Sequence, residues 1–236
     1  MCFTPKLSAS FSVAGIVATY LSYNIPELRK RYLHIIIAFY TCMEILQTLQ
    51  FYTINNCSNK FNIILTNVAF VLVIVQPLLW NTIAYFLVNT EYEKGILMLG
   101  ILLCILWILC YIFGRIYYYI EGPTPCSKCV TFNEDGNTCT KKEKGRHLYW
   151  TWSSSYLYGL NANYFMYFAI WFIPLLLAPS VRSIAIKLIF TAIIGVLITW
   201  KINGTMIEFA STWCFISIPF LLITFIYSII LTFKIK

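Results

Sequence analysis

The sequence has 236 residues, of which 60% are hydrophobic and 11% are charged, and its formal net charge is +8. A soluble domain of this length has too little interior to bury so much apolar surface, so the composition excludes an ordinary soluble globular protein. In a membrane protein, basic residues report the orientation of the loops first, so we expect no nucleic-acid partner despite the positive charge.

Seven apolar segments follow one another along the sequence. A helix that rises 1.5 Å per residue needs about 20 apolar residues to cross about 30 Å of hydrocarbon, and each segment reaches or approaches that length. Continuous apolar runs favour helices over a β-barrel. We therefore predict an all-α integral membrane bundle, with the lipid bilayer as partner and residues 1–236 as a single domain. Its seven transmembrane helices are expected at roughly 7–23, 32–52, 61–88, 95–119, 162–177, 181–200 and 206–233. No pattern predicts an oligomeric state.

The second segment contains a carboxylate, Glu44, just past its middle. A lone carboxylate at this depth costs a few kcal/mol or more unless it is protonated or paired, so Glu44 should face the bundle interior. Thr41, Glu44 and Thr48 are three and four positions apart and share one helical face, and Gln47 lies at the edge of that face.

The third segment adds Gln76 and Asn81 on either side of Pro77. Proline removes one backbone donor and leaves the carbonyl of Val73 available to a neighbouring side chain. Two interpretations of the polar set Glu44, Gln47, Gln76 and Asn81 compete. The set either holds the helices together by hydrogen bonds, or lines a cavity in which Glu44 carries a proton or binds a cation.

The fourth segment ends near Arg115, which is followed by three tyrosines. A long basic side chain at the end of a membrane helix extends to the interface, where tyrosine is also favoured. We expect this arrangement for Arg115, in preference to an ion pair with Glu44.

The polar loop at about 121–152 contains three cysteines and a histidine, and three interpretations of it remain open. A disulfide-stapled cap is the first, with a bridge from Cys57 to Cys126, Cys129 or Cys139. A zinc site is the second, because Cys126, Cys129, Cys139 and His147 are suitable ligands in number and kind; no other cofactor is expected. The third is a thiol redox pair formed by Cys126 and Cys129.

The orientation is not determined by charge, since the two loop faces carry equal numbers of basic residues. Two other signals fall on the face of the amino terminus. Asn56 and Asn203 each begin a glycosylation acceptor pattern, and the loop cysteines gather there, as in an oxidising compartment. Both signals predict an amino terminus that is outside or lumenal.

Several short motifs resemble those of a known family. The chain begins Met1-Cys2-Phe3-Thr4, and the segments 43–47, 76–81 and 147–150 read Met-Glu-Ile-Leu-Gln, Gln-Pro-Leu-Leu-Trp-Asn and His-Leu-Tyr-Trp. These motifs are similar to an uncharacterised family of small multi-pass membrane proteins, a domain of unknown function, whose members begin Met-Cys-Phe/Trp-Ser/Thr. The resemblance implies a compact helical membrane fold in which the Glu44 and Gln76–Asn81 regions belong together. It implies no activity.

Three classes of function follow from these features. The first is a small channel- or transporter-like bundle with its polar centre at Glu44. The second is a membrane-embedded enzyme that uses the cysteine-rich loop for thiol redox or zinc chemistry. The third is a structural membrane component, in which the polar residues serve only packing.

Overall fold

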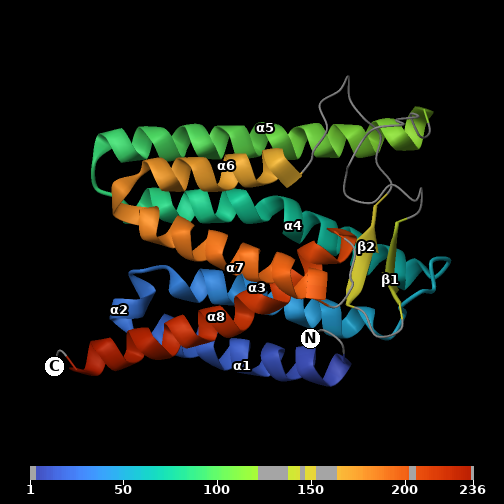
Figure 1. The fold of residues 1–236 in the computed structure, drawn as a ribbon, viewed down its shortest axis with the longest axis horizontal. Coiled ribbons are helices and arrows are strands. Elements are labelled where there is room, and N and C mark those ends of the chain that lie inside the picture. The colour runs from blue at the N-terminus through green and yellow to red at the C-terminus, as the bar shows by residue number, and fades with distance from the viewer. Residues whose placement is uncertain (1–3, 122–137, 144–146, 153–163, 202–205, 235–236) are drawn as a thin grey trace. The chain divides into compact units, whose positions relative to one another are not determined.

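The computed structural model describes residues 4–121, 138–143, 147–152, 164–201 and 206–234, and these are mostly helical (Figure 1). The helices are α1 (Pro5–Asn24), α2 (Pro26–Arg29), α3 (Leu33–Gln50), α4 (Lys60–Leu87), α5 (Glu91–Glu121), α6 (Tyr164–Leu177), α7 (Arg182–Lys201) and α8 (Met206–Lys234). A 3-10 turn, η1 (Pro179–Val181), precedes α7, and the strands β1 (Cys139–Lys142) and β2 (Leu148–Thr151) form a two-stranded sheet.

Each of the seven predicted segments corresponds to a helix, so the all-α class is confirmed. Among the described residues, five helices are long and apolar enough to cross a membrane, namely α3, α4, Glu91–Tyr117 of α5, Pro179–Lys201 and Ser211–Thr232. Helix α6 is apolar but has 14 residues, and α1 has 20 residues that include several serines. Membrane crossing by all seven helices stays a prediction. The two-stranded sheet was not predicted, because both strands are short and β1 contains two adjacent lysines.

Local sequence explains where the first helices begin and end. Thr4 precedes α1 with an extended backbone, and its Oγ1 accepts a hydrogen bond from the Leu7 amide at 3.4 Å. Pro5 and Pro26 each occupy the start of a helix, where a missing N–H costs nothing. Tyr32 adopts a left-handed conformation (φ 56°), which turns the chain into α3.

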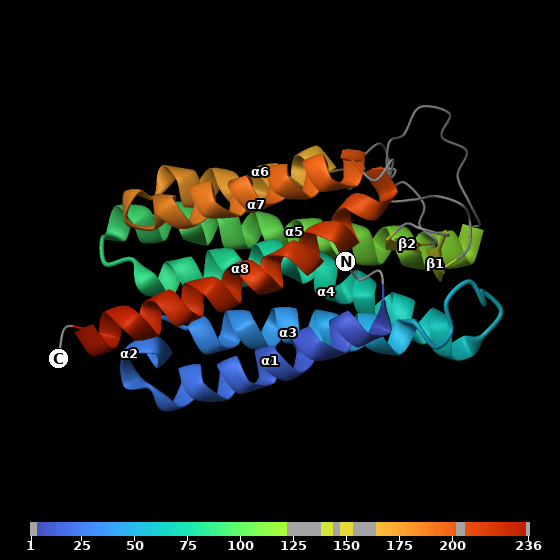
Figure 2. The same ribbon diagram turned by 60° about the horizontal axis from the view of Figure 1, so that its bottom comes forward.

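The chain forms two compact units. The first unit consists of Met1–Leu65, Thr140–Tyr149 and Thr191–Lys236. Within it α1 lies along α3, and α8 contacts both helices; Figure 2 shows α1 and α3 side by side. The α1 residues buried in the first unit are small, namely Ser8, Ser12, Gly15, Ala18 and Ser22. A Cβ atom at Gly15 would lie 2.1 Å from Thr41 Oγ1, so α1 and α3 approach closely there.

The second unit consists of Thr66–Cys139 and Trp150–Phe190. Helix α5 packs against α6, and a Cβ atom at Gly100 of α5 would lie 2.7 Å from Pro174 of α6. Aromatic rings fill this unit, with Trp107 and Tyr111 in edge-to-face contact and Trp107 also against Tyr167. Much of the packing between the helices of the second unit is therefore made by contacts between bulky and small side chains.

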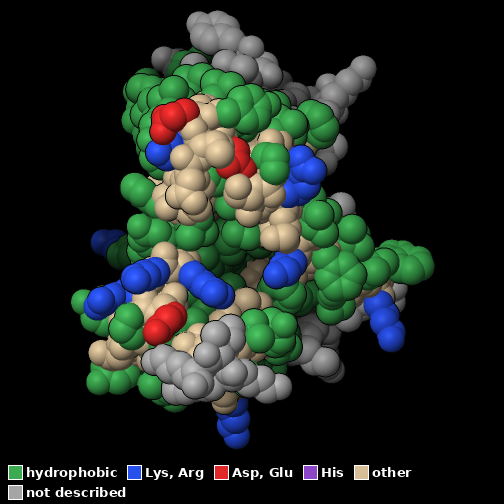
Figure 3. Space-filling view, turned by 90° about the vertical axis from the view of Figure 1, so that its left-hand side faces the viewer, with side chains coloured by type: hydrophobic (Ala, Val, Ile, Leu, Met, Phe, Trp, Pro, Cys, Tyr) green, Lys and Arg blue, Asp and Glu red, His purple; other side chains and the backbone are tan. Residues whose placement is uncertain are grey.

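Charged side chains cluster at helix ends. Figure 3 shows the side of the molecule that lies at the left in Figure 1, and basic side chains are visible there among apolar ones. In the first unit α2 ends at Arg29, and Lys30 and Arg31 follow it; all three residues are exposed. This distribution is typical of helices whose ends reach the water and whose sides do not.

Candidate functional site

Glu44 and Gln47 lie in α3 of the first unit, and both are 0% exposed. The neighbouring hydroxyl groups bond to the backbone of the same helix, Thr41 Oγ1 to Ile37 O at 2.7 Å and Thr48 Oγ1 to Glu44 O at 2.8 Å. The carboxyl group predicted to face the interior is therefore fully buried.

Gln47 is a buried side chain of this unit whose amide group lacks hydrogen bonds. Its Oε1 and Nε2 atoms are both buried and make no hydrogen bond. Thr19 Oγ1 and Ser22 Oγ of α1, and His34 Nδ1 of α3, are buried in the same way. A buried polar atom without a partner costs about 1–3 kcal/mol, so these groups retain a capacity to bind water or a small solute.

Gln76 and Asn81 lie in the second unit, where they join helices. Tyr167 of α6 donates to Gln76 Oε1 at 2.5 Å and lies 3.3 Å from Val73 O. A side-chain hydroxyl therefore lies beside the carbonyl left open by Pro77, and its single hydrogen is directed mainly to the closer acceptor, Gln76 Oε1. Asn81 Nδ2 donates to Pro77 O at 2.9 Å and to Ile170 O at 3.2 Å. For these two residues the geometry matches interhelical hydrogen bonding.

The loop after α3 is bound to strand β1. Asn55 forms two hydrogen bonds with the Lys142 backbone, accepting from N at 2.8 Å and donating to O at 2.9 Å. Asn62 accepts from Thr140 N at 2.9 Å and donates to Thr53 O at 2.7 Å. Strand β1 is therefore held against this loop by side-chain amides that imitate strand pairing.

A disulfide joins Cys57 to Cys139. The predicted bridge from Cys57 is confirmed, with Cys139 as the partner. The other two candidates, Cys126 and Cys129, lie outside the described residues, and so does the redox pair that they would form. Asn56, next to the bridge, is exposed, whereas Asn203 is outside the described residues.

The disulfide breaks the predicted zinc ligand set. A sulfur atom in a disulfide is not a thiolate, so Cys139 is not available to a metal that would also bind Cys126, Cys129 and His147. In the described part of the chain, no three histidine, cysteine, aspartate or glutamate side chains come together as a metal site. The four-ligand zinc interpretation was therefore wrong in including Cys139.

His147 and Ser211 form a buried pair that resembles a nucleophile and its base, with Ser211 Oγ 2.8 Å from His147 Nδ1. Ser211 Oγ and His147 Nδ1 both also contact Leu148 O, and the distance from Nδ1 to this oxygen is 2.9 Å. A carbonyl oxygen only accepts, so the hydroxyl and Nδ1 both donate to it, and Nδ1 carries a hydrogen. Such a nitrogen cannot take a proton from Ser211, and both side chains are 0% exposed. The pair is structural.

We predict that this pair makes the first unit acid-sensitive. Burial lowers the pKa of His147 to about 3, from an ordinary value of 6.5. Between these values the unfolded chain binds a proton that the folded chain does not, so stability is complete above pH 6.5 and falls as the pH decreases toward 3. The loss is about 1.4 kcal/mol per pH unit at most. Melting curves at pH 7 and pH 4.5 should show the decrease, and His147→Asn should reduce it; an equal decrease in the variant would refute the prediction.

Comparison with known proteins identifies the family. Residues 6–233 match the family of unknown function DUF5765. The chain belongs to the DUF5765 family. An uncharacterized protein, R287, from Acanthamoeba polyphaga mimivirus is 28% identical over 231 residues, which cover 92% of this chain and 91% of that relative. No solved structure matches significantly. The DUF5765 assignment confirms the resemblance to an uncharacterised family.

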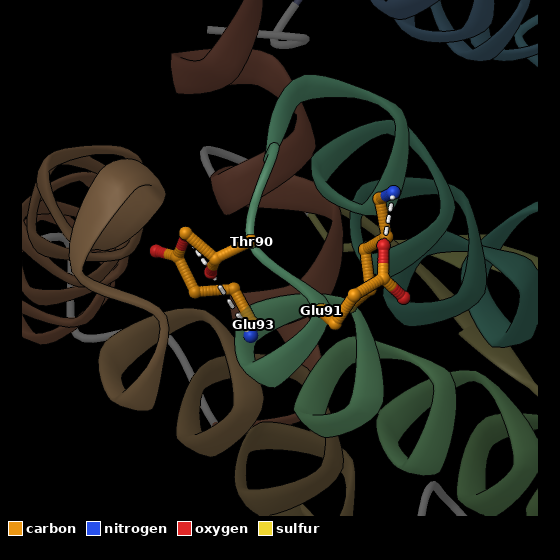
Figure 4. A network of polar contacts seen from close by, with 4 residues as sticks. Thr90, Glu91 and Glu93 are labelled. Carbon is orange, nitrogen blue, oxygen red and sulfur yellow. Dashed lines mark hydrogen bonds and ion pairs between the residues drawn. The ribbon is translucent and has the colours of Figure 1, made fainter.

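Sequence reasoning missed one polar network of this DUF5765 protein, at the start of α5 (Figure 4). Thr90 Oγ1 donates to Glu93 Oε2 at 2.8 Å and accepts from the Glu93 amide at 3.3 Å. Glu93 Oε1 also accepts from Ser180 N at 2.7 Å, and Ser180 Oγ donates to Oε2 at 2.9 Å. The pattern Thr90-Glu91-Tyr92-Glu93 is a capping-box sequence, and this signal could have identified the network.

Arg115 of the DUF5765 protein makes contacts with α4 that the sequence did not predict. Its side chain is 9% exposed, and its guanidinium lies 4.5 Å above the ring of Phe70. Nη2 donates to Asn67 Oδ1 at 2.7 Å. The side chain therefore packs inside the second unit, and its position at a membrane interface stays a prediction.

Proposed function

We propose that this DUF5765 protein is a multi-pass integral membrane protein that works as a small channel or transporter, with a polar centre at Glu44 that binds a proton or a small cation. The observation that carries the proposal is a polar seam between α1 and α3, described below. The seam includes the buried carboxylate of Glu44, and the unpartnered amide of Gln47 belongs to the next turn of α3.

Exposed apolar side chains support insertion in a bilayer. Helix α5 exposes large residues along its length, for example Leu99 (59%), Leu106 (58%) and Phe113 (56%). A soluble protein rarely exposes a continuous apolar surface of this extent, whereas lipid chains cover such a surface without cost.

Two bonds support the proposed order of crossings. Cys57 follows α3 and Cys139 follows α5, so the disulfide requires α4 and α5 to cross as a pair. Glu93, at the start of α5, bonds Ser180, which follows α6, so the chain returns across the bilayer between α5 and Ser180. These relations support a crossing by α6, although its 14 residues rise only about 21 Å.

The disulfide also supports the proposed orientation. Disulfides persist in oxidising compartments and are rare in the cytosol. If α1 and α3 both cross, the amino terminus shares a face with Cys57 and with the exposed acceptor Asn56. This face is outside or lumenal in the proposed topology.

The polar seam follows from the register of α1 and α3. The two helices run in opposite directions, and Gly15 meets Thr41. We call two facing positions, one on α1 and one on α3, a level of the pair. Every level from Ser22 to Ser8 of α1 contains at least one polar side chain. Counting equal numbers of residues along the two antiparallel helices from the contact of Gly15 with Thr41, we infer the other levels to be Ser22 with His34, Thr19 with Ile37, Ser12 with Glu44, and Ser8 with Thr48. From His34 to Thr48 the seam extends for about 21 Å, most of the thickness of the hydrocarbon.

The chemistry of the seam suits a proton or a cation better than an anion. Glu44 is its acidic group, and hydroxyl and amide oxygens are neutral ligands of the kind that coordinate hard cations. Gln47 lies one turn from Glu44 on the same helix and has an amide oxygen without a hydrogen bond. An ion held by Glu44 and Gln47 would satisfy this oxygen.

A liposome flux assay tests the proposal. We expect the reconstituted full-length protein to dissipate a proton, sodium or potassium gradient faster than empty liposomes. Glu44→Gln should reduce the flux to that of empty liposomes, because it removes the charge and keeps the shape, and Gln47→Leu should reduce it partly.

The exposed carboxylate Glu27 provides the matched control, since Glu27→Gln makes the same chemical change in the same unit. Wild-type flux in Glu44→Gln would contradict the proposal. Absence of flux in the wild-type protein would instead favour a structural membrane component. The enzyme alternative has lost one of its thiols, because Cys139 is bridged.

A further inference from the structure

Arg115 is a buried cation whose hydrogen-bonding capacity is not fully used. Nη2 donates to Asn67 Oδ1 at 2.7 Å and lies 3.4 Å from both Tyr119 Oη and Thr138 Oγ1. Nη1 is buried and makes no hydrogen bond. All of these residues belong to the second unit, so the arrangement does not depend on the first.

Among the residues that the structure describes, no carboxylate pairs with the positive charge of Arg115. In the described segments the ion pair that forms is Lys94 with Glu91, at 2.9 Å. The contacts of Arg115 are to an amide oxygen, two hydroxyl groups and the ring of Phe70, none of which carries a negative charge. A cation–π contact offsets part of the desolvation cost, but a buried guanidinium generally needs an anion or further acceptors.

The length of α5 gives the depth of Arg115 in the bilayer. Arg115 follows Glu91 by 24 positions, which corresponds to about 36 Å along a helix, whereas the hydrocarbon layer is about 30 Å thick. With Glu91 at one interface, Arg115 lies at the level of the phosphate groups of the other. Phosphate oxygens are preferred acceptors for guanidinium N–H groups.

Asn67 has the orientation that an oxyanion site requires. Arginine only donates, so the Asn67 atom that faces it must be the amide oxygen. The amide nitrogen of Asn67 then keeps its two N–H donors for other acceptors. Arg115 Nη1 and the Asn67 amide nitrogen thus belong to two side chains that are already locked together by a short hydrogen bond.

We infer that Arg115 and Asn67 form a binding site for a phosphate oxyanion, supplied by the headgroup of an anionic lipid or by free phosphate. Arg115 provides the charge and the Nη1 donor, and Asn67 provides a second donor. Phe70 supports the guanidinium from below and keeps it in place. The site is independent of the transport proposed for Glu44.

Native mass spectrometry of the detergent-purified full chain tests this site, with phosphatidic acid and phosphatidylcholine as the lipid probes and inorganic phosphate as the soluble one. We expect phosphatidic acid to bind at least about tenfold more tightly than phosphatidylcholine and to raise the melting temperature. Displacement by millimolar phosphate would identify free phosphate as a ligand, and its absence would identify the lipid.

Variants separate the site from general charge effects. Arg115→Gln should abolish the preference for phosphatidic acid. Arg115→Lys should retain part of it, because lysine keeps the charge but lacks the planar guanidinium that donates paired hydrogen bonds to phosphate. Arg182→Gln, which removes an exposed arginine of the same unit, should bind as the wild type does. If Arg115→Gln fails to fold, the wild-type comparison decides alone. Equal binding of both lipids together with no binding of phosphate would overturn the inference.

Discussion

Gly100→Ala is expected to lower the melting temperature of the purified protein, whereas Gly95→Ala should leave it unchanged or raise it slightly. Both glycines lie in α5, so both changes bring the same gain in helix propensity. The new methyl group at Gly100 would lie 2.7 Å from Pro174 Cγ and 2.9 Å from Asn81 Oδ1, while at Gly95 it would meet nothing within 4 Å.

The cost at Gly100 arises because its neighbours are rigid. Pro174 lies inside α6 and has a rigid ring, and Asn81 is held by its hydrogen bonds to Pro77 O and Ile170 O. Overpacking of this kind typically costs about 1–3 kcal/mol. Thermal unfolding of the two variants in the same detergent measures the difference. Equal melting temperatures would show that α5 and α6 are not in the close contact described here.

Removal of the disulfide by Cys57→Ser with Cys139→Ser is expected to produce the second large effect. In a freely unfolding chain, a bridge that closes a loop of about 80 residues contributes about 4.5 kcal/mol by limiting the unfolded state. In the proposed membrane topology, helices that stay inserted already restrict the unfolded state, so we expect a loss of about 2–3 kcal/mol.

The measurement is denaturant unfolding in detergent, with and without reducing agent. Cys42→Ser with Cys110→Ser serves as the control, because these two cysteines are free. The reducing agent should destabilise the wild type and the control variant, but not the variant that lacks the bridge. Unchanged stability after loss of both Cys57 and Cys139 would mean that Asn55 and Asn62 suffice to hold β1 against the loop.

The helices could be predicted from the sequence because continuous apolar runs are a local signal. The same holds for the Val73 carbonyl, since Pro77 always exposes the carbonyl four residues before it. A local signal could not predict that Cys139 is the partner of Cys57. That pairing depends on Asn55 and Asn62, which hold β1 beside the loop through contacts between residues more than 70 positions apart.

The candidate site was predictable only in part. Burial of Glu44 follows from the cost of a lipid-facing carboxylate, and this requires no knowledge of neighbours. The polar seam, in contrast, depends on the register between α1 and α3, which Gly15 and Thr41 determine by their close approach. The burial of Arg115 could not be predicted for the same reason, because it depends on contacts with Asn67 and Phe70 of another helix.

The bridge between Cys57 and Cys139 has a consequence for biosynthesis. Cys139 is synthesised after both α4 and α5, so the bond can close only once these helices have been made. In the membrane topology proposed above, insertion of α4 without α5 would leave the two cysteines on opposite sides of the bilayer, where they could not react. Oxidation of this pair is therefore a covalent mark of chains in which α4 and α5 entered together, and reduced chains would include those whose insertion failed.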